Sequence, residues 1–178
     1  LSGPAAGVVG AIEIGRAAGY NNLVTFDVGG TSTDVSLVHL GKALFSSSKV
    51  VADYPLKTPM IDIHVIGAGG GSIAWMDDAG ALKVGPRSAG ADPGPACYAR
   101  GGTDATITDA QISLHRLNPV ALLGGRLKVD EVAARRAIQD KVAVPLGISL
   151  EQAAEGVIRI ANANMSRAIR SVSTERGY

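Results

Sequence analysis

The sequence is poor in the residues that several common kinds of binding chemistry require. Its 178 residues include one cysteine, Cys97, which excludes an internal disulfide and a cysteine-rich zinc site. Aromatic residues make up only 4%, so stacking platforms for bases or sugars are scarce. The formal net charge of +1 provides no basic face for nucleic acid, and no apolar run approaches the length of a membrane span, about 18 residues. We therefore expect no nucleic-acid or membrane partner, and a reducing, cytoplasmic location.

Glycine is what the chain has in excess. It accounts for 23 of 178 residues, roughly twice the usual share. The glycines cluster at 67–71, 85–102 and 124–125, which indicates particular loops rather than low complexity. Hydrophobic residues make up 46%, enough for a core, and we expect residues 1–178 to form a single domain.

Hydrophobic periodicity and turn residues predict an α/β or α+β chain in which most strands precede most helices. Ser2 and Pro4 favour the start of a helix, Gly19 its end, and Ser149 the cap of the last helix. Residues 85–105 contain too many glycines and prolines for regular structure. Strands are predicted at 23–26, 35–40, 43–51, 60–66, 72–76 and 81–84, and helices at 2–18, 108–117, 129–141 and 150–175.

The stretch FDVGGTSTDVSL (26–37) carries the clearest functional signal. An apolar strand delivers Asp27 to its end, and a glycine-rich turn follows at once. Consecutive amide N–H groups in such a turn form an anion site, which predicts phosphate binding by Gly29, Gly30, Thr31, Ser32 and Thr33. Asp27 would then hold hydrated Mg²⁺ or orient an attacking water. The alternative is a hairpin turn with no ligand.

Two further groups are candidates for a site. Gly69, Gly70 and Gly71 must bring backbone close to something, either substrate or phosphate in a cleft or a helix packed on a strand. Asp62 and His64 share one face of a strand, where they would ligate a metal, act as acid and base, or form a polar pair without function.

Residues in the glycine- and proline-rich loop are more ambiguous. Arg87 is a candidate to clamp a carboxylate or the carbonyl of a cyclic amide, or else to brace a surface loop through ion pairs. Cys97 has no base nearby in sequence, which favours a buried structural thiol. Asp109 is best interpreted as a helix cap.

Several long segments together resemble the hydantoinase A/oxoprolinase family, within the actin-like ATPase superfamily. The resemblance covers nearly the whole chain and rests on SGPAAGVVGA (2–11), FDVGGTSTDVSLV (26–38), GAGGGSIAW (67–75), VGPRSAGADPGPACYARGGTDATITDA (84–110) and IANANMSRAIRSVSTERGY (160–178). It implies half of an actin-like, ribonuclease H-like α/β fold with a mixed sheet and flanking helices. The family's first phosphate motif and its adenosine motif are absent here, so an internal fragment, inactive by itself, is expected.

The resemblance also implies a chemistry. ATP with Mg²⁺ would activate a carbonyl oxygen by phosphorylation, for ring opening of a hydantoin or 5-oxoproline, or for carboxylation of a ketone. It places Asp27 on the metal and its water, and Gly29, Gly30 and Thr31 on the β- and γ-phosphates. A B-type subunit or domain and an oligomeric assembly are expected. A nucleotide-binding or regulatory domain without ring-opening activity, and a piece that only supports a partner's site, remain alternatives.

Overall fold

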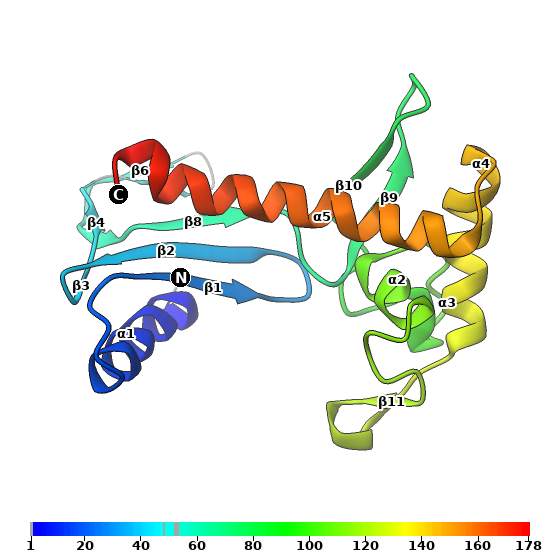
Figure 1. The fold of residues 1–178 in the computed structure, drawn as a ribbon, viewed down its shortest axis with the longest axis horizontal. Helices are drawn as coiled ribbons and strands as arrows, with labels where there is room; N and C mark the ends of the chain where they lie inside the picture. The colour runs from blue at the N-terminus through cyan, green and yellow to red at the C-terminus, as the bar shows by residue number, and fades with distance from the viewer. Residues whose placement is uncertain (1, 48, 52–53) are drawn as a thin grey trace. The chain divides into compact units, whose positions relative to one another are not determined.

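The predicted hairpin around Gly29 and Gly30 is present in the computed structural model, which describes residues 2–47, 49–51 and 54–178. Strand β1 (Leu23–Val28) runs into the turn and β2 (Thr33–His39) leaves it. Strand β2 also pairs with β3 (Lys42–Ala43) and β8 (Ile63–Ile66). The result is a four-stranded sheet in which β1 is an edge strand (Figure 1).

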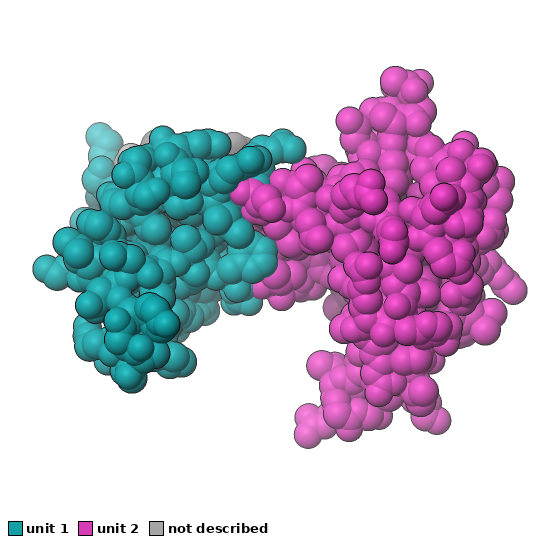
Figure 2. All heavy atoms as spheres, in the orientation of Figure 1, with its two compact units in different colours: residues 1–27, 34–65, 167–178 teal, residues 28–33, 66–166 magenta. Residues whose placement is uncertain are grey.

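Contacts divide the chain into two compact units, each built from segments that are distant in sequence (Figure 2). Unit 1 comprises residues 1–27, 34–65 and 167–178, and unit 2 comprises residues 28–33 and 66–166. The turn of the hairpin therefore belongs to unit 2, while most of β1 and β2 belongs to unit 1.

In unit 1, helix α1 (Ser2–Ala17) packs on one face of the sheet. Its Val8 meets Val38 and Ile63 in a small core, and Gly19 follows the helix with φ +84°, a conformation suited to a helix end. The end of α5 (Leu150–Val172) and the 3₁₀ turn Thr174–Arg176 complete the unit, and the His39 and Tyr178 rings are 5.0 Å apart. Side chains of β2 alternate between faces, so Leu37 and His39 point away from α1.

Unit 2 is built around a larger core of alanine, valine and isoleucine. Strands β9 (Ser72–Met76) and β10 (Leu82–Ser88) form the predicted hairpin, beside helices α2 (Ile107–Ser113) and α3 (Glu131–Ile138). The small side chains of α5 allow close packing onto this core, and Ser149 and Gln152 cap its start reciprocally. The buried α5 residues are Ala153, Ala154, Val157, Ile158 and Ala161.

Three predicted elements differ from the structure. The strand expected at 43–51 is broken into β3, β4 (Phe45–Ser46) and β5 (Lys49–Val51), because each piece pairs with a different partner. The strand expected at 60–66 is interrupted at Asp62, between β7 (Met60–Ile61) and β8. The helix expected at 129–141 leaves α-geometry after Ile138 and continues as a π-helical turn, Gln139–Ala143.

The remaining elements are short. Strand β6 (Tyr54–Leu56) pairs with β5, and β11 (Ala121–Leu122) pairs with β12 (Leu127–Lys128). Helix α4 is Val144–Leu146, and 3₁₀ turns lie at Ala96–Tyr98 and Leu123–Gly125. The loop expected at 85–105 is thus partly regular, since β10 enters it and a 3₁₀ turn lies within it. Among the described residues, none of the helices has the length and apolarity to cross a membrane.

Candidate functional site

The turn after Asp27 leaves a row of backbone donors unused. Within the turn, the Gly29 N–H donates to the Ser32 carbonyl at 2.8 Å. The N–H groups of Gly30, Thr31 and Ser32 find no acceptor among the residues that the structure describes. Gly30 and Thr31 are also exposed. Three successive free amides in an exposed turn are a suitable cradle for an anion such as phosphate.

The glycines at 69–71 support this turn from behind. Gly70 N–H donates to the Gly29 carbonyl at 3.0 Å, and Gly71 N–H donates to the Gly30 carbonyl at 2.6 Å. The buried Thr33 hydroxyl donates to the Ala68 carbonyl. A peptide carbonyl points opposite to the N–H of the next residue, so these bonds from Gly70 and Gly71 hold the Gly30 and Thr31 N–H groups facing away from residues 69–71.

A side chain at Gly69 would collide with the turn, and one at Gly71 would press against it. A Cβ on Gly69 would lie 2.7 Å from the Gly29 oxygen and 2.8 Å from the Ser32 nitrogen, and one on Gly71 would lie 3.0 Å from the Gly30 oxygen. Those neighbours are backbone atoms, which cannot move aside cheaply. The close approach predicted for this segment is therefore made mainly to the turn, rather than between a strand and a helix. Gly70 also touches α2, through the Thr108 hydroxyl.

The hydroxyl residues of the turn have different roles in the structure. Thr31 is exposed, and its hydroxyl is 3.5 Å from that of Ser88. Ser32 is half-buried with its hydroxyl unpaired among the described residues. Thr33 is 0% exposed, so its side chain braces the glycine segment and has no access to a ligand. Thr31 and Ser32 remain the hydroxyl candidates for phosphate.

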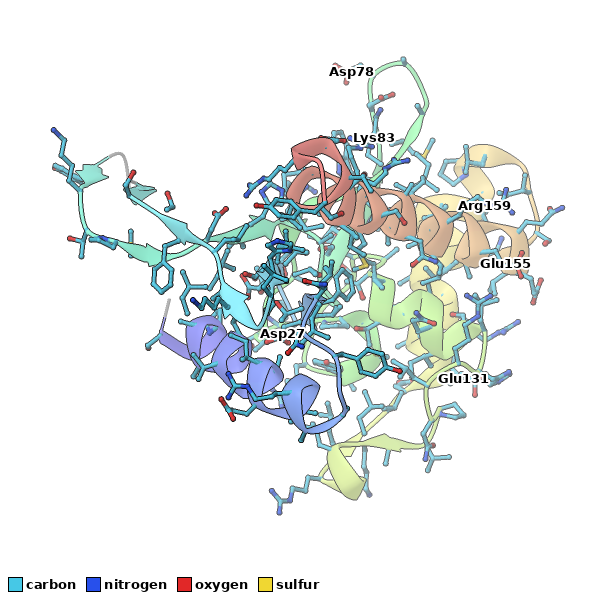
Figure 3. The ribbon with its side chains drawn as sticks, turned by 60° about the vertical axis from the view of Figure 1, so that its left-hand side comes forward. Asp27, Asp78, Lys83, Glu131, Glu155 and Arg159 are labelled. Carbon is cyan, nitrogen blue, oxygen red and sulfur yellow. The ribbon has the colours of Figure 1, made fainter. Side chains whose placement is uncertain are left out.

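A pocket of about 290 Å³ in unit 1 contains Asp27 together with a second carboxylate, Asp34. Figure 3 shows Asp27 beside α1, whose Pro4, Gly7 and Ala11 line the same pocket. Gly7 has no atom within 4 Å of where a Cβ would be, so the glycine leaves this space open. The pocket thus combines two carboxylates with a wall of small side chains.

Asp34 was not among the residues singled out from the sequence. The sequence signal that identifies Asp34 is the alternation of side chains along the strands on both sides of the turn. Side chains two residues apart share a face, so Thr25 lies with Asp27 on β1, and Asp34 lies with Ser36 on β2. All four line the pocket. The Thr25 hydroxyl donates to the Ser36 carbonyl at 3.3 Å, which ties the two strands together there.

The two carboxylates suit magnesium better than zinc. Among the described residues there is no group of three or more His, Cys, Asp or Glu that could hold a metal ion. Structural and catalytic zinc sites need at least three protein ligands, whereas Mg²⁺ is commonly held by one or two carboxylates together with phosphate oxygens and water. Asp27 and Asp34 therefore fit the Mg²⁺ ion that the sequence of the turn suggested.

Asp62 and His64 do not form a pair in the structure. The Asp62 carboxylate instead forms an ion pair with Arg176, and its carbonyl accepts from the Ser36 hydroxyl at 2.8 Å. His64 is half-buried and has no partner among the described residues. Arg87 is exposed in unit 2, and its guanidinium lies 6.0 Å from the centre of the Trp75 ring, within cation–π range.

The structural interpretations of Cys97 and Asp109 are confirmed. Asp109 is buried, forms a capping box with Thr106, and accepts from the N–H groups of Ala96 and Cys97. Burial raises the pKa of the Asp109 carboxyl despite these donors. Burial, followed by the charge of Asp109, also raises the pKa of the Cys97 thiol, which therefore stays protonated and is a poor nucleophile.

One protein-family model matches the sequence along all of its 178 residues. The hydantoinase/oxoprolinase model matches residues 1–178. The chain belongs to the hydantoinase/oxoprolinase family. Its resemblance to that family, inferred from the sequence segments, is thereby confirmed.

Sequence identity to an individual member of the family is high. The chain is 48% identical over 177 residues to the alpha subunit of caprolactamase from Pseudomonas jessenii, covering 99% of this chain and 25% of that protein. The chain thus spans about a quarter of the length of this relative.

Two solved structures have the same fold. A nucleotide-free structure of acetone carboxylase matches with a TM-score of 0.90 at 37% identity, over 99% of this chain and 25% of that one. The ATP-dependent caprolactamase of P. jessenii matches with a TM-score of 0.86 at 47% identity, over 98% and 25%. The predicted α/β, actin-like ATPase fold is confirmed.

Proposed function

We propose that this chain is part of a subunit that uses ATP to open a cyclic amide. The observation that carries the proposal is the turn at 29–32, whose free Gly30 and Thr31 amides are held outward by backbone bonds from Gly70 and Gly71. A preorganised row of donors stabilises charge on a transferring phosphoryl group without reorganising during the reaction. The similarity to an ATP-dependent caprolactamase supports this use of the turn.

In the proposed reaction, the γ-phosphoryl group of ATP moves to the carbonyl oxygen of the ring amide and ADP leaves. Water then attacks the activated carbon, the ring C–N bond breaks, and the nitrogen takes up a proton. A second water is consumed as phosphate is released. The balance is one cyclic amide, one ATP and two waters giving one ring-opened amino acid, ADP and phosphate.

The residues of this chain have separate parts in that proposal. The N–H groups of Gly30, Thr31 and Ser32 bind phosphate oxygens. Asp27 and Asp34 would hold Mg²⁺, which would supply charge neutralisation to the phosphates when bound. Asp27 would also orient the water that attacks the activated carbon. Arg87 and His64 remain candidates for contacting the substrate, while Asp62 serves to anchor the C-terminal turn.

A second candidate reaction is ATP-dependent carboxylation of a ketone through an enol phosphate. The TM-score of 0.90 with acetone carboxylase supports it. Both reactions begin with phosphorylation of a carbonyl oxygen, so the same turn serves either one. We favour the cyclic amide because sequence identity is higher to the caprolactamase structure, 47% against 37%.

The test is ATP hydrolysis by the full-length protein together with its B-type partner subunit. Phosphate release is measured alone and with caprolactam, 5-oxoproline, a hydantoin or acetone plus bicarbonate. We expect one cyclic amide to stimulate hydrolysis. Asp27→Asn should lower that stimulated rate by about 100-fold or more, since it removes a charge that acts directly on phosphoryl transfer.

The matched control is Asp78→Asn, at the exposed tip of the β9–β10 hairpin (Figure 3). It removes the same charge from unit 2 and should leave the rate unchanged. If acetone plus bicarbonate stimulated hydrolysis and none of the cyclic amides did, ketone carboxylation would be the reaction instead. Hydrolysis that no substrate alters would point to a regulatory nucleotide-binding domain, and a fully active Asp27→Asn variant would refute the role of Asp27.

A further inference from the structure

The Gly70 carbonyl accepts two hydrogen bonds from a single residue of α2. Thr108 donates its backbone N–H to this oxygen at 2.8 Å and its hydroxyl to the same oxygen at 2.9 Å. Thr108 is only 6% exposed, and it was not among the residues singled out from the sequence. Because the N–H already satisfies the carbonyl, the buried hydroxyl adds a second restraint on the direction of that peptide.

The peptide that carries this carbonyl also carries the Gly71 N–H, on its opposite edge. The Gly71 N–H donates to the Gly30 carbonyl at 2.6 Å. The Gly30 carbonyl lies in turn opposite the Thr31 N–H, which is one of the free donors of the turn. Two peptides therefore connect Thr108 with the Thr31 amide in a continuous series of hydrogen bonds. Bonds in such a series polarise and strengthen one another.

A second series of hydrogen bonds reaches the Gly30 amide by a different route. The Ser72 N–H donates to the Gly69 carbonyl at 2.9 Å. Across that peptide, the Gly70 N–H donates to the Gly29 carbonyl at 3.0 Å. The Gly29 carbonyl lies opposite the Gly30 N–H. The Gly30 amide is thus supported from within residues 69–72, whereas the Thr31 amide is linked to α2.

The start of α2 is itself fixed, so Thr108 is able to restrain the glycine segment. Thr106 and Asp109 form the capping box of the helix, and both are 0% exposed. Ile73 of β9 also pairs with Thr106 in an antiparallel bridge. All of these residues belong to unit 2 together with the turn at 29–32. The arrangement is therefore internal to one compact unit.

We propose that Thr108 is a positioning residue for the phosphate-binding turn, and that it sets the direction of the Thr31 N–H through the Gly70 and Gly30 peptides. The inference rests on the proposed function, in which the Thr31 N–H binds a phosphate oxygen of ATP. Donors of this kind are effective because their direction is fixed before the ligand arrives. A change at Thr108 should therefore alter phosphate binding by a turn to which Thr108 does not belong.

The first measurement follows the Thr31 amide in the full-length protein without nucleotide. Backbone N–H signals of isotope-labelled threonine are recorded by NMR, and the Thr31 signal is identified by its loss in Thr31→Ser. In Thr108→Val, a methyl group replaces a hydroxyl that lies 2.9 Å from the Gly70 oxygen, which is too close for carbon. We expect the Thr31 signal to shift by more than its line width. Thr108→Ser keeps the hydroxyl and should return the signal to its original position.

Ser113→Ala is the matched control. Ser113 also lies on α2, it is 2% exposed, and its hydroxyl has no partner within the described part of the chain. The substitution therefore deletes a buried hydroxyl from the same helix without disturbing the bonds to Gly70. The Thr31 signal should not move. Thermal unfolding followed by circular dichroism checks that all the variants are folded.

The second measurement compares the affinity of the full-length protein for ATP and for AMP, each with Mg²⁺, by calorimetry. The family resemblance places the turn on the β- and γ-phosphates, which AMP lacks. Thr108→Val should weaken ATP binding about five- to tenfold, as expected for one misdirected hydrogen bond to a charged group, and AMP binding less than about twofold. Thr108→Ser should restore ATP binding. A merely structural loss would weaken both nucleotides alike.

Three outcomes would overturn the proposal: a Thr31 signal that stays in place in Thr108→Val, equal weakening of ATP and AMP, or the same effects in Ser113→Ala. Failure of the proposed function would look different. ATP hydrolysis that no cyclic amide stimulates would refute the reaction, while the Thr31 signal and the comparison of nucleotides would still decide the role of Thr108. A full-length protein that binds no ATP would overturn both.

Discussion

Adjacent hydroxyl residues of the turn differ sharply in what surrounds them. Thr33 is 0% exposed and bonded to the Ala68 carbonyl, whereas Thr31 is exposed with only a long contact to Ser88, at 3.5 Å. We expect Thr33→Val to leave that buried carbonyl without its donor. The free energy of opening the 66–72 segment should fall by about 1–3 kcal/mol.

Hydrogen exchange of residues 66–72 in the full-length protein measures this loss as faster exchange. Thr31→Val is the control, because it removes the same hydroxyl from an exposed position and should leave exchange of 66–72 unchanged. Equal protection in both variants would show that the Thr33 bond contributes little.

At the scale of elements, the central observation is that one glycine-rich segment supports another. We expect Gly69→Ala to displace the turn at 29–32, because the new methyl group would meet backbone atoms at 2.7–2.8 Å. ATP turnover by the full-length protein should drop more than about tenfold, since small displacements of positioned donors are costly in catalysis.

Gly10→Ala provides the comparison for this variant. Gly10 lies in α1, and a Cβ there would have no neighbour within 4 Å. Alanine should preserve turnover, and it should stabilise the helix by about 0.5–1 kcal/mol. If Gly69→Ala is as active as Gly10→Ala, the segment at 69–71 is not a support for the phosphate-binding turn.

At the scale of the whole molecule, each unit joins segments that are far apart in sequence. Within unit 1, the Asp62–Arg176 ion pair links residues 114 positions apart. Its side chains are 26% and 40% exposed, so solvent screens the pair and we expect a coupling energy of only about 0.5 kcal/mol.

A double-mutant cycle with Asp62→Asn and Arg176→Gln tests this value. The observable is the opening free energy of residues 173–178 by hydrogen exchange, in the full-length protein. A coupling above about 2 kcal/mol would mean that the pair is much better shielded from water than its exposure indicates.

The amino-acid sequence by itself determined the local elements and the chemical character of the turn. The 2–18 helix, the hairpin around Gly29 and Gly30, the β9–β10 hairpin and the final helix were all predictable, because caps, glycines and apolar periodicity act over a few residues. The capping role of Asp109 followed for the same reason. Family membership followed from long segments that are specific in composition and order.

Only the tertiary structure decided which distant segments meet. It placed Gly69–Gly71 against the turn, buried Thr33, brought Asp34 into the pocket with Asp27, and gave Asp62 to Arg176 instead of His64. It also divided the strand expected at 43–51, because β3, β4 and β5 each pair with a different strand. The Thr33–Ala68 bond and the Asp62–Arg176 pair join residues 35 and 114 positions apart, and no local propensity encodes contacts over such separations.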